Sequence, residues 1–343
     1  MRATISSALL ILLVSCSSLD LKLPDKLGIP KKEEPAQVLA IKQKWKQYKS
    51  SAFIAPFETK PSVQAPYAAG KLSEEFLEDG LNRTKFVRFL AGLSEDVVLS
   101  PELVERGQHG AVLLAKTGFL SHTPQRPKDM DQNFYKLAYK STSTSNIHQS
   151  VGRSSSLSDA VTSFCDDSDP SNIDRVGHRR WVLNPPLKET GFGYASVGGG
   201  QAGATYITMQ VIGEGCPEVV DIAYVAWPAA GYFPSNMFGP RQAWSISLNP
   251  KKYNLARSRP TVELTRMDDG KVWAFTDRDK KKDGKYFNID RSGMGLPYCI
   301  IFRPDGVSDL LFKNQYRVKI GGLVGQDGKP APIEYEVRFF TLL

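Results

Sequence analysis

One short stretch of the sequence, Asn172–Tyr194, gathers side chains that carry chemistry. It places His178 directly before Arg179 and Arg180, followed by a tryptophan and a diproline. A histidine changes its charge near neutral pH, and the arginine fork binds carboxylate and phosphate groups. We therefore expect His178 to form one wall of a polar cleft, in which Arg179 and Arg180 could clamp an anionic group such as a carboxylate or phosphate. The alternative is that one of these arginines pairs with an acidic loop residue and locks the fold.

Two more residues are placed to join such a cleft. His122 follows a helix expected from Ser100 to about Lys116, and the exit of a buried helix is a good place to present a side chain. Asp167 follows another predicted helix, where its negative charge opposes the helix dipole; it is therefore either solvated or retained for a function. His178 or His122 is then a candidate general base that Asp167 orients. The chain has no GxSxG, SxxK or HExxH motif.

Helical periodicity dominates the part of the chain that holds these residues. Apolar residues recur at helical spacing from Leu72 to a stop at Gly92. A second helix begins after Ser100, which is a good N-cap followed by proline. A capping-box pattern at Ser156 begins a third, strongly amphipathic helix. The intervening segment, Thr123–Ser155, is predicted to be mostly loop.

The C-terminal part of the chain has a different character. After Val220, short runs of β-branched and aromatic residues alternate with turn residues, as in AWSISL, YCIIFR and EYEVRFFTLL. This spacing predicts an all-β sandwich with a boundary near Asp221–Ala226. Before both parts, Ala36–Ser50 has the narrow apolar stripe of a helix that flanks the folded chain.

The N-terminus resembles the signal peptide of a bacterial lipoprotein. Arg2 precedes a short apolar run that ends in Leu13-Val14-Ser15-Cys16. We expect cleavage before Cys16 and lipid on its sulfur, which would anchor the protein to a membrane surface outside the cytoplasm. The alternative is an ordinary secretory peptide that contains a chance cysteine.

The formal net charge of +8 is concentrated beside this predicted anchor. Leu21–Ser50 contains eight lysines against three acidic residues, a net charge of +5. Anionic lipid or a surface polymer would attract such a segment, and a solvated spacer is the simpler interpretation. No folded face with interleaved arginines and aromatics is apparent, so we expect no nucleic-acid partner.

Three cysteines remain besides Cys16. Cys165 lies on the apolar face of the third predicted helix, and we expect it to be a buried free thiol. Cys216 and Cys299 could pair in an oxidising compartment, although the sequence alone does not establish this pairing. No CxxC or zinc-finger spacing occurs.

Four motifs, taken in order, resemble the CAP superfamily of cysteine-rich secretory, antigen and pathogenesis-related proteins. They are Asn82-Arg83, Leu120-Ser121-His122, Ser145-Asn146-Ile147, and Val176-Gly177-His178 leading to Gly191-Phe192-Gly193. The resemblance covers about Leu72–Asp221 and is greatest to bacterial lipoprotein members with a C-terminal β-domain. It implies an α+β protein, in which a CAP α-β-α sandwich precedes an all-β, immunoglobulin-like sandwich.

The cleft of that family holds two histidines and two acidic residues. The resemblance places the histidines at His122 and His178 and one acidic residue at Asp167, where a glutamate is more usual. Ser145 occupies the place of the other acidic residue, so at most three metal ligands remain. Two imidazoles and a carboxylate would still suit zinc; alternatively, the histidines only hydrogen-bond one another and the loops. The expected ligand cleft consists of His122, Ser145, Asn146, Asp167, His178 and Arg179.

The sequence thus predicts a lipoprotein signal peptide at 1–15, a lipidated cysteine with basic tether and flanking helix at 16–70, a CAP domain at 71–222 and a β-sandwich at 223–343. The first functional hypothesis is a cleft that binds a small polar, lipid or cell-envelope ligand, with zinc or another divalent metal held by His122 and His178. The second is a metal- or His-assisted hydrolase of cell-envelope or host substrates, with Ser145 or Ser121 as the nearby nucleophiles. The third treats both domains as adhesion modules whose cleft residues are structural.

Overall fold

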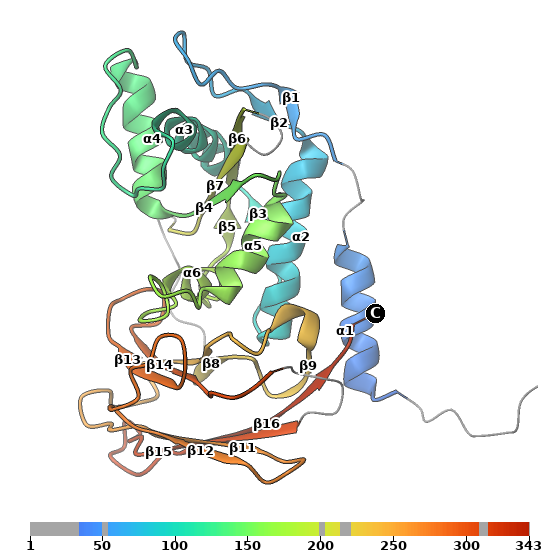
Figure 1. Cartoon of the computed structure of the whole chain (residues 1–343), viewed down its shortest axis with the longest axis vertical. Helices are drawn as coiled ribbons and strands as arrows, with labels where there is room; N and C mark the ends of the chain where they lie inside the picture. The colour runs from blue at the N-terminus through green and yellow to red at the C-terminus, as the bar shows by residue number, and fades with distance from the viewer. Residues whose placement is uncertain (1–33, 50–53, 199–202, 213–220, 309–314, 343) are drawn as a thin grey trace, which may run out of the picture. The chain divides into compact units, whose positions relative to one another are not determined.

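The computed structural model describes residues 34–49, 54–198, 203–212, 221–308 and 315–342. The fold is mixed α+β, with helices and several β-sheets (Figure 1). The predicted signal peptide, the lipidation site Cys16, most of the basic tether and Cys216 lie outside the described residues. No helix in the described part of the chain is both long and apolar enough to cross a membrane.

Residues 54–198 and 203–212 form a helical lobe around a small antiparallel sheet. The sheet has the order β4-β7-β6, from β4 (Ser145–Val151), β7 (Ala204–Gln210) and β6 (Phe192–Val197). Helix α3 (Pro101–Thr117) packs on β6 and β7 and against α4 (Gln132–Thr144), whereas α2 (Glu74–Leu90) packs against α5 (Leu157–Asp166). The short helix α6 (Gly177–Val182) follows α5. Two small ladders complete the lobe: β1 (Phe57–Thr59) with β2 (Lys71–Leu72), and β3 (Val98–Leu99) with β5 (Glu189–Thr190).

Two adjacent residues of β6 show that α2 and α3 lie on opposite faces of the sheet. A Cβ atom built on Gly80 of α2 would meet the ring of Phe192, whereas one built on Gly107 of α3 would meet the backbone of Phe192 and Gly193. Successive strand residues point to opposite faces. The lobe therefore has three layers, with helices on both sides of the sheet (Figure 1).

The predicted starts and stops of two helices are confirmed. Helix α3 begins after Ser100 with Pro101 in its first turn, and it ends at Gly118 in the left-handed conformation that glycine favours. At the start of α5 the Ser156 hydroxyl accepts from the Asp159 N–H, and the Asp159 carboxylate accepts from the Ser156 N–H. This is the capping box that the sequence predicts.

Helix α4 and strand β4 correct the prediction that Thr123–Ser155 is mostly loop. The Asp131 carboxylate caps α4 by accepting from the N–H groups of Asn133 and Phe134. The Ser/Thr-rich sequence has low intrinsic helix propensity, but α4 packs closely on α3: a Cβ built on Gly110 would lie 2.2 Å from the Ser141 hydroxyl oxygen. Tertiary packing therefore overrides the local preference.

Residues 221–308 and 315–342 form a sandwich of two sheets. One has the order β13-β14-β10-β8, from β13 (Tyr286–Asp290), β14 (Tyr298–Arg303), β10 (Trp244–Leu248) and β8 (Tyr224–Trp227). The other has the order β12-β11-β15-β16-β9, from β12 (Val272–Phe275), β11 (Thr261–Arg266), β15 (Gln315–Gly321), β16 (Ile333–Phe340) and β9 (Gly231–Pro234), with a 3₁₀ turn η2 (Ser235–Met237) after β9. All pairs are antiparallel except β9 with β16.

Aromatic rings from both sheets fill the space between them. The ring of Trp244 on β10 lies 5.7 Å from Tyr316 and 6.1 Å from Phe339 of the other sheet. Phe275 and Phe302 make a similar contact at 5.1 Å. Residues of β11 and β12 alternate between exposed and buried, so one face of this sheet lies in the core and the other faces solvent. The predicted sandwich is thus held by one shared aromatic core.

Helix α1 (Ala36–Tyr48) does more than flank the folded chain. Val38 and Ile41 of its predicted stripe are buried in the main core. The Trp45 ring lies 5.1 Å from Phe86 of α2, and the Gln37 side-chain oxygen accepts from the Tyr232 N–H of β9 at 2.9 Å. Helix α1 therefore contacts both the helical lobe and the sandwich.

The approach of α3 to β6 gives a first prediction. A Cβ on Gly193 would lie 2.0 Å from the Gly107 carbonyl oxygen. This oxygen belongs to the backbone, so it cannot move aside as the end of a flexible side chain can. We expect Gly193→Ala to lower the free energy of unfolding by about 1–3 kcal/mol or more, measured by urea denaturation. Gly239→Ala is the control, because a Cβ there meets nothing within 4 Å. Equal stability of the two variants would show that α3 and β6 are not in backbone contact.

Candidate functional site

Arg179 joins the helical lobe to the sandwich. It has no exposed surface. Its guanidinium donates to the carbonyl oxygens of Cys165 at 2.7 Å and Asp166 at 2.5 Å, at the end of α5. It also donates to the Ala243 carbonyl at 2.6 Å and the Ser245 hydroxyl at 3.0 Å, at the start of β10. A positive charge is favourable beside the last carbonyls of a helix, so one side chain satisfies acceptors of both parts.

This placement corrects the prediction that Arg179 lines the ligand cleft. Burial lowers the pKa of its guanidinium, and nearby Asp167 and Asp166 oppose that shift. Its donors are used by protein oxygens, so it is not presented to a ligand. The alternative, in which an arginine locks the fold, describes Arg179 better.

Arg180 and Asp174 form a second set of contacts between the same two parts. Arg180 pairs with Asp290 and donates to the carbonyl oxygens of Ser292 and Leu296 at 2.9 and 2.8 Å. Asp174 accepts from Lys282 and Tyr286 of the sandwich. Two carboxylates near the junction are therefore already paired with protein donors.

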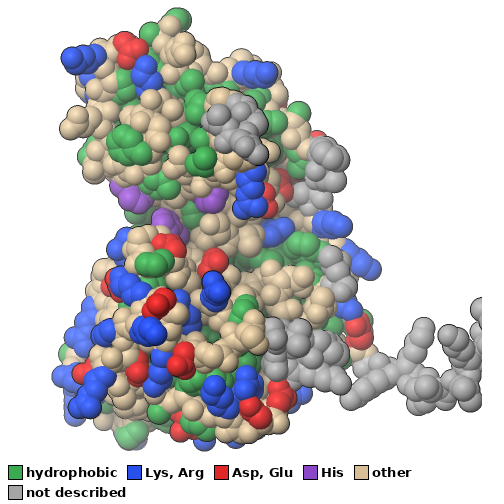
Figure 2. All heavy atoms as spheres, viewed as in Figure 1, with side chains coloured by type: hydrophobic (Ala, Val, Ile, Leu, Met, Phe, Trp, Pro, Cys, Tyr) green, Lys and Arg blue, Asp and Glu red, His purple; other side chains and the backbone are tan. Residues whose placement is uncertain are grey.

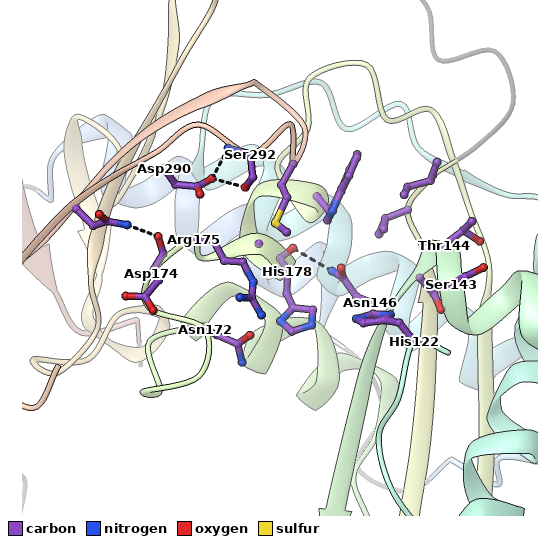
Figure 3. A pocket seen from close by; sticks show the side chains of 17 residues that line it. His122, Ser143, Thr144, Asn146, Asn172, Asp174, Arg175, His178, Asp290 and Ser292 are labelled. Carbon is purple, nitrogen blue, oxygen red and sulfur yellow. Dashed lines mark hydrogen bonds between the residues drawn. The ribbon is translucent and has the colours of Figure 1, made fainter. Parts of the chain in front are cut away.

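A cleft of about 600 Å³ lies at this junction. The helical lobe supplies most of its wall, and the sandwich supplies one side through β13 and the loop after it. Histidine side chains gather beside the hollow between the two parts in Figure 2. The cleft is lined by His122, Ser143, Thr144, Ser145, Asn146, Asn172, Asp174, Arg175, Gly177, His178, Trp181, Val211, Ile212, Asn288, Asp290, Ser292 and Met294 (Figure 3).

His178 is oriented by Asp167 from behind the cleft. Its Nδ1 lies 2.8 Å from Asp167 Oδ1, and its backbone N–H donates to Asp167 Oδ2 at 2.8 Å. The ring stacks on Phe164, with centroids 5.5 Å apart. The Asp167 side chain is 2% exposed and does not line the cleft. A carboxylate requires a donor, so Nδ1 carries the proton and Nε2 is the lone-pair nitrogen of the neutral ring.

The backbone is strained at both ends of this pair. Asp167 has φ of 45° and Val176 has φ of 41°, both in the left-handed region. Aspartate tolerates this region, but a β-branched valine there is a genuine outlier. Such strain costs about 1–3 kcal/mol and persists only where surrounding contacts over-determine the backbone. The position of His178 is therefore imposed by its surroundings.

His122 is held in a similar way from another segment. Its Nδ1 lies 2.7 Å from the Thr142 carbonyl oxygen, while the Thr142 hydroxyl donates to the His122 carbonyl at 3.3 Å. A carbonyl only accepts, so Nδ1 again carries the proton. Neither Nε2 has a hydrogen-bond partner in the part of the chain that the structure describes. Both histidines line the same cleft, as Figure 3 shows.

The described residues contain no group of three His, Cys, Asp or Glu side chains that could hold a metal ion. The two imidazoles do suit a metal, since ligating histidines usually donate the other ring nitrogen to a carbonyl or carboxylate. Asp167, the expected third ligand, is instead occupied by His178 and the backbone. A catalytic zinc centre has three protein ligands, so these residues do not fit a complete one.

Ser145 and Asn146 also line the cleft, as expected. Both are buried, at 5% and 1% exposed. The Ser145 hydroxyl donates to the Ser141 carbonyl at 2.6 Å, and the Asn146 amide donates to the His178 carbonyl at 2.9 Å. The Ser145 proton therefore goes to a carbonyl and not to a histidine. This geometry is unlike that of a nucleophile activated by a base.

Sequence reasoning missed the wall that the sandwich contributes. The signal was an internal repeat: Asn172-Ile173-Asp174-Arg175 recurs as Asn288-Ile289-Asp290-Arg291, each followed two residues later by glycine. The two segments meet, since the Asn288 side chain donates to the Asp174 carbonyl at 2.5 Å. Both repeats therefore present side chains to one cleft (Figure 3).

No protein-family model, curated protein or solved structure matches this chain. The site is therefore interpreted from its own geometry.

The two other described cysteines take no part in the cleft. Cys165 is a buried free thiol, as predicted, and burial raises its pKa to about 12. Cys299 is also a buried thiol, and Cys216, with which it could pair, lies outside the described residues.

His148 gives a prediction about pH. Its ring makes an edge contact with Phe164, on which His178 stacks. Burial lowers the pKa of His148 below its ordinary 6.5. The unfolded chain therefore takes up this proton more readily, so stability is lost as the pH falls through 6.5. We expect His148→Gln to reduce the loss of unfolding free energy between about pH 7.5 and about pH 5, by up to about 1.4 kcal/mol per pKa unit.

Urea denaturation at both pH values measures this loss. His109→Gln is the matched control, because His109 lies on α3 outside the cleft with its ring against Phe134. An unchanged pH dependence in His148→Gln would contradict the prediction.

Proposed function

We propose that the cleft at the junction binds a small polar ligand through His122 and His178. One observation carries this proposal: each histidine has its Nδ1 fixed by a protein oxygen, which leaves Nε2 of both rings for a ligand in one cleft. Fixed side chains bind without a further loss of rotamer entropy. The volume of about 600 Å³ is in the ordinary range for small-molecule sites.

We propose further that the helical lobe is a CAP domain and the sandwich is immunoglobulin-like. The three-layer arrangement and the order of the four motifs support the first assignment. Nine strands in two packed sheets around a single aromatic core support the second. The CAP assignment is consistent with the placement of His122 and His178, which the resemblance expected to share a cleft.

The proposed setting of the protein follows from its N-terminus. A lipid on Cys16 would anchor the chain to a membrane outside the cytoplasm, with the cleft facing cell-envelope or host components. The ligand is then a molecule of that surface. In the adhesion alternative, the same surface binds the domains while the cleft residues are structural.

Hydrolysis is a second candidate, and the His178–Asp167 pair favours it. A histidine whose Nδ1–H is bound by a buried carboxylate has Nε2 available as a general base near neutral pH. Since the Ser145 proton is committed to a carbonyl, His178 would have to activate a water molecule. Binding remains the primary proposal because it requires only the contacts already described.

Asparagine substitutions separate the two roles of each histidine. The asparagine amide can replace the Nδ1–H donor, whereas Nε2 is lost. We expect His122→Asn and His178→Asn to remain folded but to lose at least about tenfold in affinity for polar ligands, since a hydrogen bond to a charged ligand contributes about 1.5–3 kcal/mol. Ligand-observed NMR with a library of sugars, amino acids and small phosphates measures this loss.

His109→Asn is the control for that experiment. A wild-type chain that binds none of these polar probes, or binds them equally well after both substitutions, would refute the proposed function. Zinc calorimetry on the same variants tests the metal. Heat of binding that vanishes in both variants would support a zinc ion shared by the two imidazoles, and no heat in the wild type would remove it.

A further inference from the structure

We infer that the ligand of this cleft is an acidic sugar, bound through its anionic group by Arg175 and through its hydroxyl groups by both walls. This inference rests on the proposed function and adds the chemical class of the ligand. It also gives the sandwich a role in recognition that an adhesion module or a rigid support would not need.

Charge balance in the cleft points to an anion. Of the charged residues in its wall, Asp290 pairs with Arg180, and Asp174 pairs with Lys282. Arg175 is exposed and lines the cleft, and its guanidinium has no ion pair or hydrogen bond within the described residues. Figure 3 shows Arg175 among the side chains around this space, together with His178 and Asn172. The wall therefore holds one cation that has no ion-pair partner among the described residues, and the carboxylate that acts on it electrostatically, Asp174, is already paired with Lys282.

Arginine is well suited to this role. Its planar fork donates two parallel hydrogen bonds to a carboxylate or phosphate, and it stays charged at any physiological pH. The two Nε2 atoms of the histidines add polar contacts on the same side. The anion that the sequence suggested for Arg179 is thus assigned to Arg175, four residues earlier.

The rest of the wall suits a molecule rich in hydroxyl groups. Its polar members are hydroxyls and amides, which both donate and accept, and carboxylates, which accept; a sugar hydroxyl can bond to each of them. Asn172 comes from the helical lobe, whereas Asn288 and Ser292 come from the sandwich. Each already has a protein partner: Asn172 donates to Asp169, Asn288 to the Asp174 carbonyl and Ser292 to Asp290. A ligand rich in hydroxyl groups can add hydrogen bonds at their remaining donor and acceptor positions, which a purely apolar ligand cannot do.

Trp181 supplies an apolar surface in the same cleft. It is half-buried and lies in α6, three residues after His178. Aromatic rings give a large contact area at low entropy cost, and the carbon–hydrogen face of a sugar ring is apolar. Val211 and Met294 also line the cleft and add apolar surface to that of Trp181. Polar groups, apolar surface and a cation without an ion pair together match an acidic sugar.

Paired sugars test the inference. The full chain is titrated by calorimetry with glucuronate against glucose, galacturonate against galactose, and glucose 6-phosphate; acetate serves as an anion without hydroxyl groups. We expect the acidic sugars to bind at least about tenfold more tightly than their neutral parents, because the contact to Arg175 is charge-assisted. Preference for the carboxylate or for the phosphate identifies the anion, and either one supports the inference.

Two matched variants locate the contact. Arg175→Gln should remove the preference for acidic sugars, whereas Arg291→Gln should leave it unchanged. Arg291 holds the equivalent position in the second repeat, but it lies over the Tyr298 ring and does not line the cleft. Both residues are exposed, so neither substitution should impair folding.

Any one of the following outcomes would overturn the inference. They are equal binding of acidic and neutral sugars, equal behaviour of the two variants, and binding of acetate as tight as that of the acidic sugars. A chain that binds none of these sugars also overturns it. If other polar probes still bind in a His122- and His178-dependent way, the proposed function survives that failure.

Discussion

The structure depends on the burial of one charge, the guanidinium of Arg179. It has no exposed surface, and such desolvation is costly unless hydrogen bonds compensate it. The compensating acceptors belong to two different parts of the chain: the last carbonyls of α5 and the start of β10. Neither the α5 carbonyls nor the β10 acceptors alone bind all the N–H donors of the Arg179 guanidinium. Removing the sandwich would expose the charge and take away the acceptors at Ala243 and Ser245, so the sandwich completes the hydrogen bonding of a residue in the helical lobe.

The functional geometry follows from that junction. Fixing α6 against β10 places His178 over Asp167, and the neighbouring Arg180–Asp290 pair brings the second repeat against the first. The cleft lies beside these contacts, so residues of both the helical lobe and the sandwich form its wall. The three arginines of this short segment have different roles. Arg179 and Arg180 are buried between the helical lobe and the sandwich, whereas Arg175 lines the cleft. The sequence around His178 suggests that its arginines bind a ligand, but Arg179 and Arg180 bond to protein oxygens instead.

The sequence predicted the helices α2, α3 and α5 and the β-rich second half, because their periodicity and caps are local signals. It missed α4 and β4, whose Ser/Thr-rich residues have weak preferences that packing on α3 overrides. His122 could be selected from its position after a helix, and His178 from the basic and aromatic residues that follow it. Arg179 was misplaced because its acceptors at Ala243 and Ser245 lie more than sixty residues away. The sandwich wall was missed for the same reason, although its repeat is visible in the sequence.

The most direct test of this account is hydrogen exchange measured by mass spectrometry as urea is increased. If Arg179 joins the two parts, peptides of the helical lobe and of the sandwich should lose protection at one shared midpoint in the wild type. Arg179→Met leaves at least three buried carbonyls without their donor, at about 1–3 kcal/mol each, and should separate the midpoints of the two parts. Separate midpoints in the wild type, or a shared and unshifted midpoint in Arg179→Met, would contradict the account.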